Sequence, residues 1–94
     1  MTSERSITKQ AMHYLERLPH SWWLKVHGGP YQKTGVPDII GCYRGRFFAF
    51  EIKVPGGRTT PKQDHEVERI QEAGGAVSVV ESLREIQKLI GTKP

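Results

Sequence analysis

Apolar residues near the start of the chain recur at helical spacing. Ile7, Ala11 and Leu18 fall on one face of a helix. Ser3 is a suitable N-cap and Pro19 is a stop signal, so we expect a first helix from about Ser3 to Leu18.

Short apolar runs bounded by turn residues fill the middle of the chain and predict strands. A Gly-Gly-Pro segment and a Pro-Gly-Gly segment separate some of the runs, and Arg44-Gly45 forms a tight turn between two others. The expected strands are Trp22–His27, Pro37–Tyr43, Arg46–Val54 and Ala76–Val80.

Two further helices complete the pattern. Thr60, Pro61 and Gln63 provide a cap, a proline at the first helical position and a capping-box partner. This helix ends at Gly74-Gly75 and is followed by the last strand. Its expected inward residues are Val67, Ile70 and Ala73, and the final helix, capped by Ser82, contributes Leu83, Ile86, Leu89 and Ile90.

The resulting order, α-β-β-β-α-β-α, predicts an α/β (more narrowly α+β) fold with a small mixed sheet flanked by helices. Ninety-four residues favour one domain over residues 1–94. No apolar run is long enough to cross a bilayer and no signal peptide is apparent, so we expect no membrane partner and a cytoplasmic location. The single Cys42, which we expect in the core, excludes an internal disulfide and a cysteine-paired zinc site.

Composition adds a modest preference for a polyanionic partner. The net charge is +4, but lysines and arginines are spread along the chain without a basic tail. Arg58, Lys62 and the free N–H groups at the second helix start could hold phosphate, as could His27 at a strand end. A solvated basic face is the alternative.

Three charged residues interrupt the apolar strands around the Arg44-Gly45 turn. A two-residue turn makes the numbers of paired residues sum to about 89, which places Asp38 opposite Glu51. Because side chains alternate along a strand, Asp38, Glu51 and Lys53 then share one face at the open end of the hairpin. The opposite face belongs to Phe48, Phe50 and Ile52.

Adjacent carboxylates repel one another unless a proton or a cation lies between them. A divalent metal with oxygen ligands meets this need, and Mg²⁺ commonly uses one or two carboxylates together with substrate phosphate. Lys53 could position a water or stabilise charge on phosphorus. The alternative is that Asp38 belongs to a turn and that Glu51 and Lys53 lie on an exposed edge strand.

Glu4 and Gln63 extend the inner stripes of their helices, and each has a structural alternative. Glu4 could simply favour the helix dipole, and Gln63 could serve only the capping box. Trp22-Trp23 is expected to place one ring in the core and the other at an interface.

The residues around the hairpin resemble a known family. Pro37-Asp38 and Glu51-Ile52-Lys53, with twelve residues between them, resemble the PD-(D/E)XK nuclease signature. The flanking segments are an early Glu in helix one, Lys25-Val-His27-Gly-Gly, Gly35-Val-Pro-Asp38, Pro55-Gly-Gly and Gln63 at a helix start. Together they look like a stand-alone VRR-NUC domain of the type found in phages.

This resemblance implies a restriction-endonuclease-like core and a set of site residues. Metal ligands would be Asp38, Glu51 and Glu4, with the Ile52 carbonyl as a backbone ligand. Lys53 would be the catalytic lysine, Gln63 its supporting polar residue, and Lys25 a contact to DNA phosphate. Glu16 is the rival of Glu4, but it lies off the apolar stripe of helix one.

The resemblance also implies an activity: a Mg²⁺-dependent endodeoxyribonuclease, a phosphodiester hydrolase in which Mn²⁺ could substitute. Compact relatives of this kind look like homodimers that act on branched DNA such as four-way (Holliday) junctions. A non-catalytic nucleic-acid-binding module and an accessory subunit of a larger repair or replication complex are the alternatives. Intact Asp38, Glu51 and Lys53 argue against a pure binding role, because two carboxylates would repel phosphate.

Overall fold

The seven expected elements form in the expected order. The computed structural model describes residues 2–91. Among these residues, none of the helices is both long and apolar enough to cross a membrane. The elements are α1 (Glu4–Leu15), β1 (Ser21–Lys25), β2 (Ile39–Tyr43), β3 (Arg46–Ile52), α2 (Pro61–Glu72), β4 (Ala76–Val80) and α3 (Leu83–Gly91).

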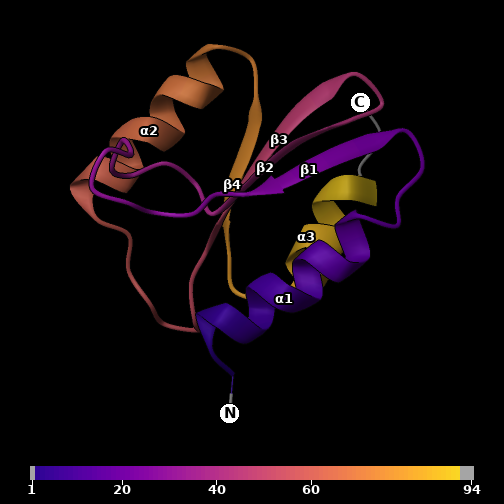
Figure 1. Cartoon of the computed structure of the whole chain (residues 1–94), viewed down its shortest axis with the longest axis horizontal. Coiled ribbons are helices and arrows are strands. Elements are labelled where there is room, and N and C mark those ends of the chain that lie inside the picture. The colour runs from indigo at the N-terminus through magenta and orange to yellow at the C-terminus, as the bar shows by residue number, and fades with distance from the viewer. Residues whose placement is uncertain (1, 92–94) are drawn as a thin grey trace.

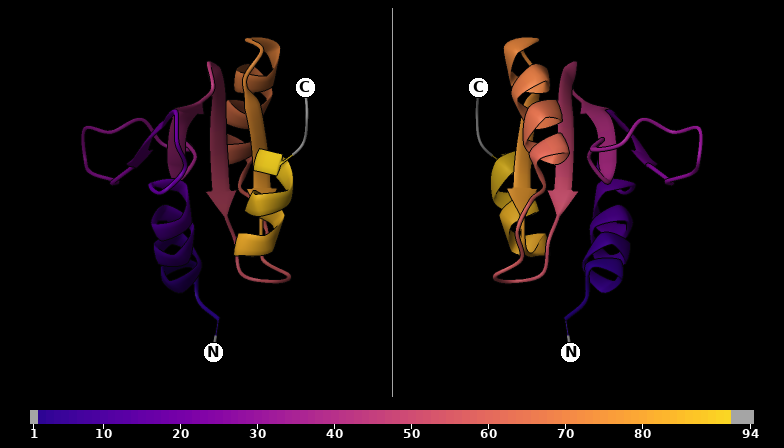
Figure 2. Two further views of the ribbon diagram at one scale, coloured as in Figure 1. Left: turned by 90° about the vertical axis from the view of Figure 1, so that its right-hand side faces the viewer. Right: turned by 90° about the vertical axis from the view of Figure 1, so that its left-hand side faces the viewer.

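The four strands form one mixed sheet in the order β1-β2-β3-β4, which confirms the predicted fold class. β1, β2 and β3 pair antiparallel, whereas β3 and β4 are parallel because α2 connects them. Figure 1 shows α1 and α3 side by side, and Figure 2 shows α2 and α3 on opposite sides of β4. One face of the sheet is therefore covered by α1 and α3, and the other face is covered, within the described part of the chain, only by α2.

The register of the β2–β3 hairpin is the one predicted from the turn. Ile39 pairs with Phe50 and Tyr43 pairs with Arg46. The two turn residues, Arg44 and Gly45, have φ values of 50° and 81°. Positive φ at both central positions is what a type I′ hairpin turn requires. The turn thus sets which side chains of β2 and β3 face the same way.

The core lies between the sheet and the pair of helices α1 and α3. Phe48 and Phe50 stack with ring centroids 6.2 Å apart on this face. Gly41 lies beneath Trp23, where a Cβ atom would stand only 2.3 Å from the indole ring. No larger residue fits this position without moving the strand or the ring. The buried cluster consists of Ile7, Ala11, Leu15, Trp23, Ile39, Phe48, Phe50, Ile52, Val80, Ile86 and Ile90.

The other face of the sheet is only partly covered. α2 packs against β4, and within residues 2–91 no helix covers the β1–β2 part of this face. Apolar side chains are therefore exposed there, and Trp22 is 61% exposed while its neighbour Trp23 is 8% exposed. We call the exposed residues Trp22, Leu24, Cys42 and Phe47 the uncovered strip. Cys42 was expected in the core and this prediction is wrong, because its strand face has no helix above it.

The three predicted helix caps form, although α1 is shorter than expected; at α3, the Ser82 hydroxyl accepts the Glu85 N–H. The Ser3 hydroxyl accepts the Ser6 N–H, and Thr60 and Gln63 make the complete capping box of α2. After Leu15 the hydrogen bonds of the chain tighten to i→i−3, so α1 ends three residues before Leu18.

The inner side of α2 is less buried than its sequence suggested. Val67 and Ile70 are half-buried, and Ala73 is exposed at the helix C-cap, contrary to prediction. The cause is geometric: α2 lies over the edge of the sheet, so no residue of this helix is fully enclosed.

Candidate active site

Two carboxylates meet where β2 begins and β3 ends. Asp38 directly precedes β2, and Glu51 is the next-to-last residue of β3. The observed pairing of Ile39 with Phe50, continued by one residue, brings Asp38 opposite Glu51. The hairpin therefore places both side chains on one face at its open end.

Asp38 is fixed by the backbone on both sides. Its carboxylate oxygen Oδ2 accepts the N–H of Ile52 at 2.7 Å, and its main-chain carbonyl accepts the N–H of Val26 at 2.8 Å. The Ile52 N–H of β3 therefore bonds to the Asp38 side chain instead of to a backbone carbonyl of the neighbouring strand. This explains why β2 begins at Ile39 and not at Pro37. The Oδ2 atom of Asp38 thus supports the sheet, and the Asp38 carboxyl also interacts with the Glu51 carboxyl.

Glu51 is 2% exposed and has two polar side chains near its oxygen Oε2. The Gln63 amide donates to this oxygen at 3.3 Å, and the Lys53 ammonium lies 4.0 Å from it. Gln63 also accepts the Thr60 N–H at 2.9 Å through its own amide oxygen. One side chain of Gln63 therefore makes both the capping-box contact and a contact to Glu51, and its role in the site stays a prediction.

Burial and Asp38 raise the pKa of the Glu51 carboxyl to about 8. Burial is the largest cause, followed by the hydrogen bond to Asp38 and by the charge of Asp38. The Lys53 ammonium lowers this pKa, but at 4.0 Å it does not offset the other effects. Without a cation, the pair therefore holds a proton near neutral pH.

Glu4 lies at the start of α1, exposed, and close enough that its charge contributes to the raised pKa of Glu51. Glu16, its rival, is exposed and lines a hollow between α1 and β1 together with Lys25. Among residues 2–91, no three acidic, histidine or cysteine side chains gather into a ready metal-binding group. Glu4 thus lies near Asp38 and Glu51 but does not form a three-ligand group with them, and its role as a metal ligand stays a prediction.

The Asp38–Glu51 pair fits a divalent cation with oxygen ligands. Two carboxylates that share one proton in a buried site would exchange that proton for a cation at lower cost than both ionising alone. The Ile52 peptide group lies directly beside them, because its N–H donates to Asp38. Two carboxylates leave further ligand positions for water and phosphate oxygens, the arrangement that Mg²⁺ favours.

The four predicted DNA contacts are all exposed and fall in two places. Lys25 ends β1 and His27 follows two residues later. Arg58 precedes α2, and Lys62 belongs to its first turn, where Gly35 approaches the Lys62 carbonyl too closely for any side chain. The site residues and these contacts stay predictions, since their positions alone do not establish binding.

One basic feature was missed at the level of sequence. Arg5, Lys9 and His13 follow one another at intervals of four residues on the exposed side of α1, and Arg17 continues this spacing in the turn after the helix. The four-residue spacing of these basic residues could have predicted this feature, but helical spacing was used only to place the apolar residues of the helix. The bond from Ile52 to Asp38 had no sequence signal at all, because it depends on the exact backbone path before β2.

Comparison with known proteins decides the family. No family model and no curated protein matches the chain. A solved structure described as a VRR-NUC domain superposes with a TM-score of 0.80 over the whole of both chains, at 28% sequence identity. This chain is a VRR-NUC domain. A second solved structure, a VRR-NUC domain protein, matches in fold with a TM-score of 0.73, 17% identity and coverage of 95% of this chain and 85% of that one.

Both similar structures cover the part of this chain that holds the carboxylate pair. Both matches extend over the hairpin and over α2, the elements that carry Asp38, Glu51, Lys53 and Gln63. The family expected from Pro37-Asp38 and Glu51-Ile52-Lys53 is thereby confirmed.

Proposed function

We propose that this VRR-NUC domain is a divalent-metal-dependent endonuclease that hydrolyses DNA phosphodiester bonds. The observation that carries the proposal is the buried pair of carboxylates, Asp38 and Glu51, with Lys53 and Gln63 beside it. Similarity to solved VRR-NUC domains supports a nuclease of the PD-(D/E)XK type. A protein that only bound DNA would gain nothing from two carboxylates facing phosphate.

Each side chain has a distinct task in the proposed hydrolysis. Asp38 and Glu51 would hold Mg²⁺, or Mn²⁺ in its place, with Glu4 and the Ile52 carbonyl as further ligands. When bound, the ion would neutralise the pair and stabilise negative charge on the phosphate oxygens. Gln63 keeps the Glu51 carboxylate in one orientation through its amide.

Lys53 stands where charge builds during the reaction. Water oxygen bonds to phosphorus, one P–O ester bond breaks, and the departing oxygen takes up a proton. The Lys53 ammonium is mostly buried. The backbone of Lys53 is held at the end of β3, because its main-chain N–H donates to the Val80 carbonyl at 2.9 Å. It can therefore donate a hydrogen bond to the incoming water or to a phosphate oxygen without rearrangement.

The uncovered strip supports a homodimer that acts on branched DNA. Trp22, Leu24, Cys42 and Phe47 carry no charge, whereas the chain as a whole has a net charge of +4. Such a surface offers no cation to DNA phosphates, whereas a second copy would bury it without like-charge repulsion. Two chains supply two sites, and a branched substrate with two-fold symmetry requires two cuts.

Cleavage assays test this function directly. Labelled four-way junctions, flaps and linear duplexes are incubated with the purified protein in Mg²⁺, in Mn²⁺ and in EDTA. We expect cleavage only with a divalent ion, preferential cleavage of branched DNA, and loss of cleavage in Glu51→Gln. Glu68→Gln, which removes an exposed carboxylate of α2, is the matched control and should cleave normally.

Two results would contradict the proposal. One is DNA binding without cleavage under every metal condition and unchanged by Asp38→Ala, which would indicate a binding module. The other is cleavage that persists in EDTA. Activity that appears only after a partner protein is added would instead identify an accessory subunit.

A further inference from the structure

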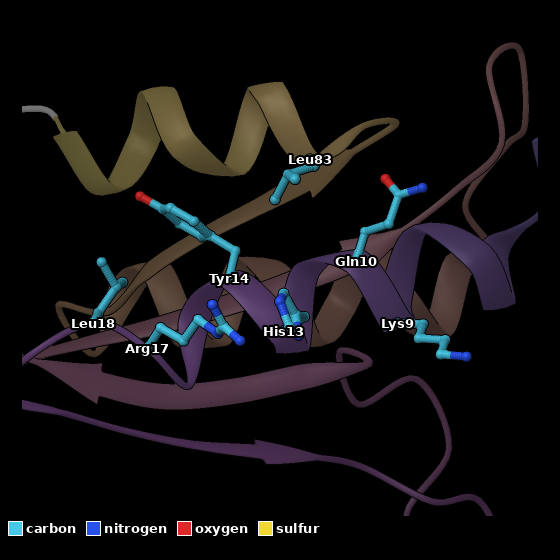
Figure 3. Close-up of a pocket in the computed structure, with 7 residues that line it drawn as sticks. All are labelled: Lys9, Gln10, His13, Tyr14, Arg17, Leu18 and Leu83. Carbon is cyan, nitrogen blue, oxygen red and sulfur yellow. The ribbon is translucent and has the colours of Figure 1, made fainter.

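The exposed side of α1 carries a row of basic residues that no step of the proposed hydrolysis uses. Arg5, Lys9, His13 and Arg17 are all exposed and recur every four residues; the first three lie on α1, and Arg17 lies in the turn that follows it. We call these four residues the basic ridge. Figure 3 shows Lys9, His13 and Arg17 following one another along the helix. Because each step advances about 6 Å, the ridge is about 18 Å long.

The charges of the ridge are not balanced within the protein. In the part of the chain that the structure describes, the ion pairs are Lys33 with Glu66 and Lys53 with Glu51. No carboxylate lies within ion-pair distance of Arg5, Lys9 or Arg17 in residues 2–91. Their attraction is therefore available to an external polyanion.

Lys25 adds a cation to one flank of the ridge. A hollow of about 520 Å³ between α1 and β1 is lined by Arg5, Lys9, His13 and Lys25, with Glu16 as its single carboxylate. The cations come from two elements and face one space, which is the arrangement that phosphate groups favour. The expected phosphate contact of Lys25 thus gains neighbours that the sequence had not suggested.

The other flank has a different character. A hollow of about 700 Å³ between α1 and α3 is lined mainly by carbon atoms, with Tyr14, Leu18 and Leu83 pointing into it (Figure 3). An acidic peptide could lie there, but it would leave Arg5 and Lys25 without a partner, because neither lines this hollow. A ligand that uses the whole row of cations must instead follow the ridge itself.

The ridge begins at the candidate active site. Glu4, the first residue of α1, is close enough to Glu51 to affect its pKa, and Arg5 is the next residue. From there the ridge leads away from the carboxylate pair for about 18 Å, which corresponds to about five base pairs of duplex at 3.4 Å each. A DNA arm whose scissile phosphate lay at the pair could therefore extend along α1.

We propose that the basic ridge and Lys25 hold the phosphate backbone of a duplex DNA arm as it leaves the active site. The inference rests on the proposed function for its direction, and it adds a binding surface made of residues outside the catalytic set. The contacts are to phosphate, so they contribute affinity and orientation without reading base sequence.

Binding measurements with single substitutions test the ridge. Lys9→Gln and Arg17→Gln remove one charge each at exposed positions, so the fold should be retained. Arg69→Gln, on the exposed side of α2 across the sheet, is the matched control. Affinity for a labelled four-way junction is measured by fluorescence anisotropy in EDTA over a range of salt concentrations, so that no cleavage interferes.

We expect each ridge variant to bind about 3- to 10-fold more weakly, and its plot of log affinity against log salt to flatten by about 0.9 for each lost phosphate contact. Arg69→Gln should match wild type. With arms shortened below about five base pairs, wild type and Arg17→Gln should converge, because the DNA no longer reaches the far end of the ridge. Arg69→Gln should also cleave a junction at the wild-type single-turnover rate.

Three outcomes would overturn the ridge. The first is unchanged affinity and salt slope in both variants, and the second is an equal loss in Arg69→Gln, which would reflect net charge alone. The third is unchanged DNA binding together with capture of a polyglutamate probe that Lys9→Gln abolishes, which would indicate an acidic protein partner. If the wild-type protein cleaves no DNA but Lys9→Gln weakens its DNA binding, the proposed role of the ridge stands and only the proposed nuclease activity is contradicted.

Discussion

Asp38 performs two tasks with one carboxylate, and a pair of substitutions separates them. Asn at this position keeps an oxygen that can accept the Ile52 N–H but removes the charge that a cation needs. We expect Asp38→Asn to retain stability within about 1 kcal/mol and to lose cleavage by about 10²- to 10³-fold. Urea unfolding and a junction-cleavage assay measure the two effects.

Asp38→Ala is the comparison that completes this test. This substitution also removes the acceptor. The buried Ile52 N–H is then left without a partner, which should lower the free energy of unfolding by about 1–3 kcal/mol. Equal stability of the Asn and Ala variants would contradict the structural role of Asp38, and full activity of Asp38→Asn would contradict its role in the site.

Glu51 makes the stability of the metal-free protein depend on pH in an unusual direction. Its folded pKa, about 8, lies above the ordinary value of 4.5, so the folded chain keeps a proton that the unfolded chain releases. The stabilisation is complete below pH 4.5 and is lost as the pH rises toward 8. In EDTA we therefore expect the free energy of unfolding to fall by on the order of 2–4 kcal/mol over this range.

Urea denaturation at a series of pH values measures this dependence. Glu51→Gln cannot ionise, so it should lack this part of the pH dependence. Adding Mg²⁺ at high pH should restore stability to wild type but not to Glu51→Gln, because a bound cation replaces the proton. Parallel pH profiles of the two proteins in EDTA would show that Glu51 is not perturbed.

At the scale of the element, α2 is linked to the site through its first turn. Thr60 and Gln63 form the capping box together, but only Gln63 also contacts Glu51. Thr60→Ala and Gln63→Ala should each destabilise the protein by about 0.5–2 kcal/mol through the lost cap. Cleavage should fall by about 10-fold or more only in Gln63→Ala, because Glu51 then loses its orienting donor.

Thermal unfolding and single-turnover cleavage of both variants distinguish the cap from the site. If Thr60→Ala reduced cleavage as strongly as Gln63→Ala, the integrity of the helix start would explain the loss and the contact to Glu51 would carry no special role.

The hairpin explains why sequence alone could place the carboxylate pair. A two-residue turn at Arg44-Gly45 allows one register, and the strict alternation of a strand then fixes the faces of Asp38 and Glu51. The alternation of side chains along a strand does not tell which helices pack on each face of the sheet. For this reason Cys42 was wrongly expected in the core. Cover depends on where α2 docks, and that is decided by contacts between distant elements.

For the whole molecule, the uncovered strip is the feature that most needs a partner. Trp22 is its most exposed large residue, at 61%, and replacing this ring removes the greatest apolar area. We expect wild type to sediment as a dimer and Trp22→Ser to shift toward monomer. Tyr31→Ser is the matched control, because Tyr31 is a fully exposed aromatic residue of a loop outside the strip.

Sedimentation equilibrium over a range of protein concentrations measures the shift. A wild-type protein that remains monomeric throughout, or an equal shift in Tyr31→Ser, would show that the strip does not join two copies. In the first case, cutting both strands of a junction would require two independent binding events.

The bond between Asp38 and the Ile52 N–H also has an evolutionary consequence. A side chain that completes a sheet, as Asp38 does, cannot be replaced freely even when activity is no longer selected, because most replacements would leave a buried N–H donor without an acceptor. The side-chain contacts of Glu51 and Lys53 are to other side chains and not to a backbone N–H of the sheet. Descendants of this chain that had become inactive would therefore lose Glu51 or Lys53 first and keep Asp38 or an asparagine in its place.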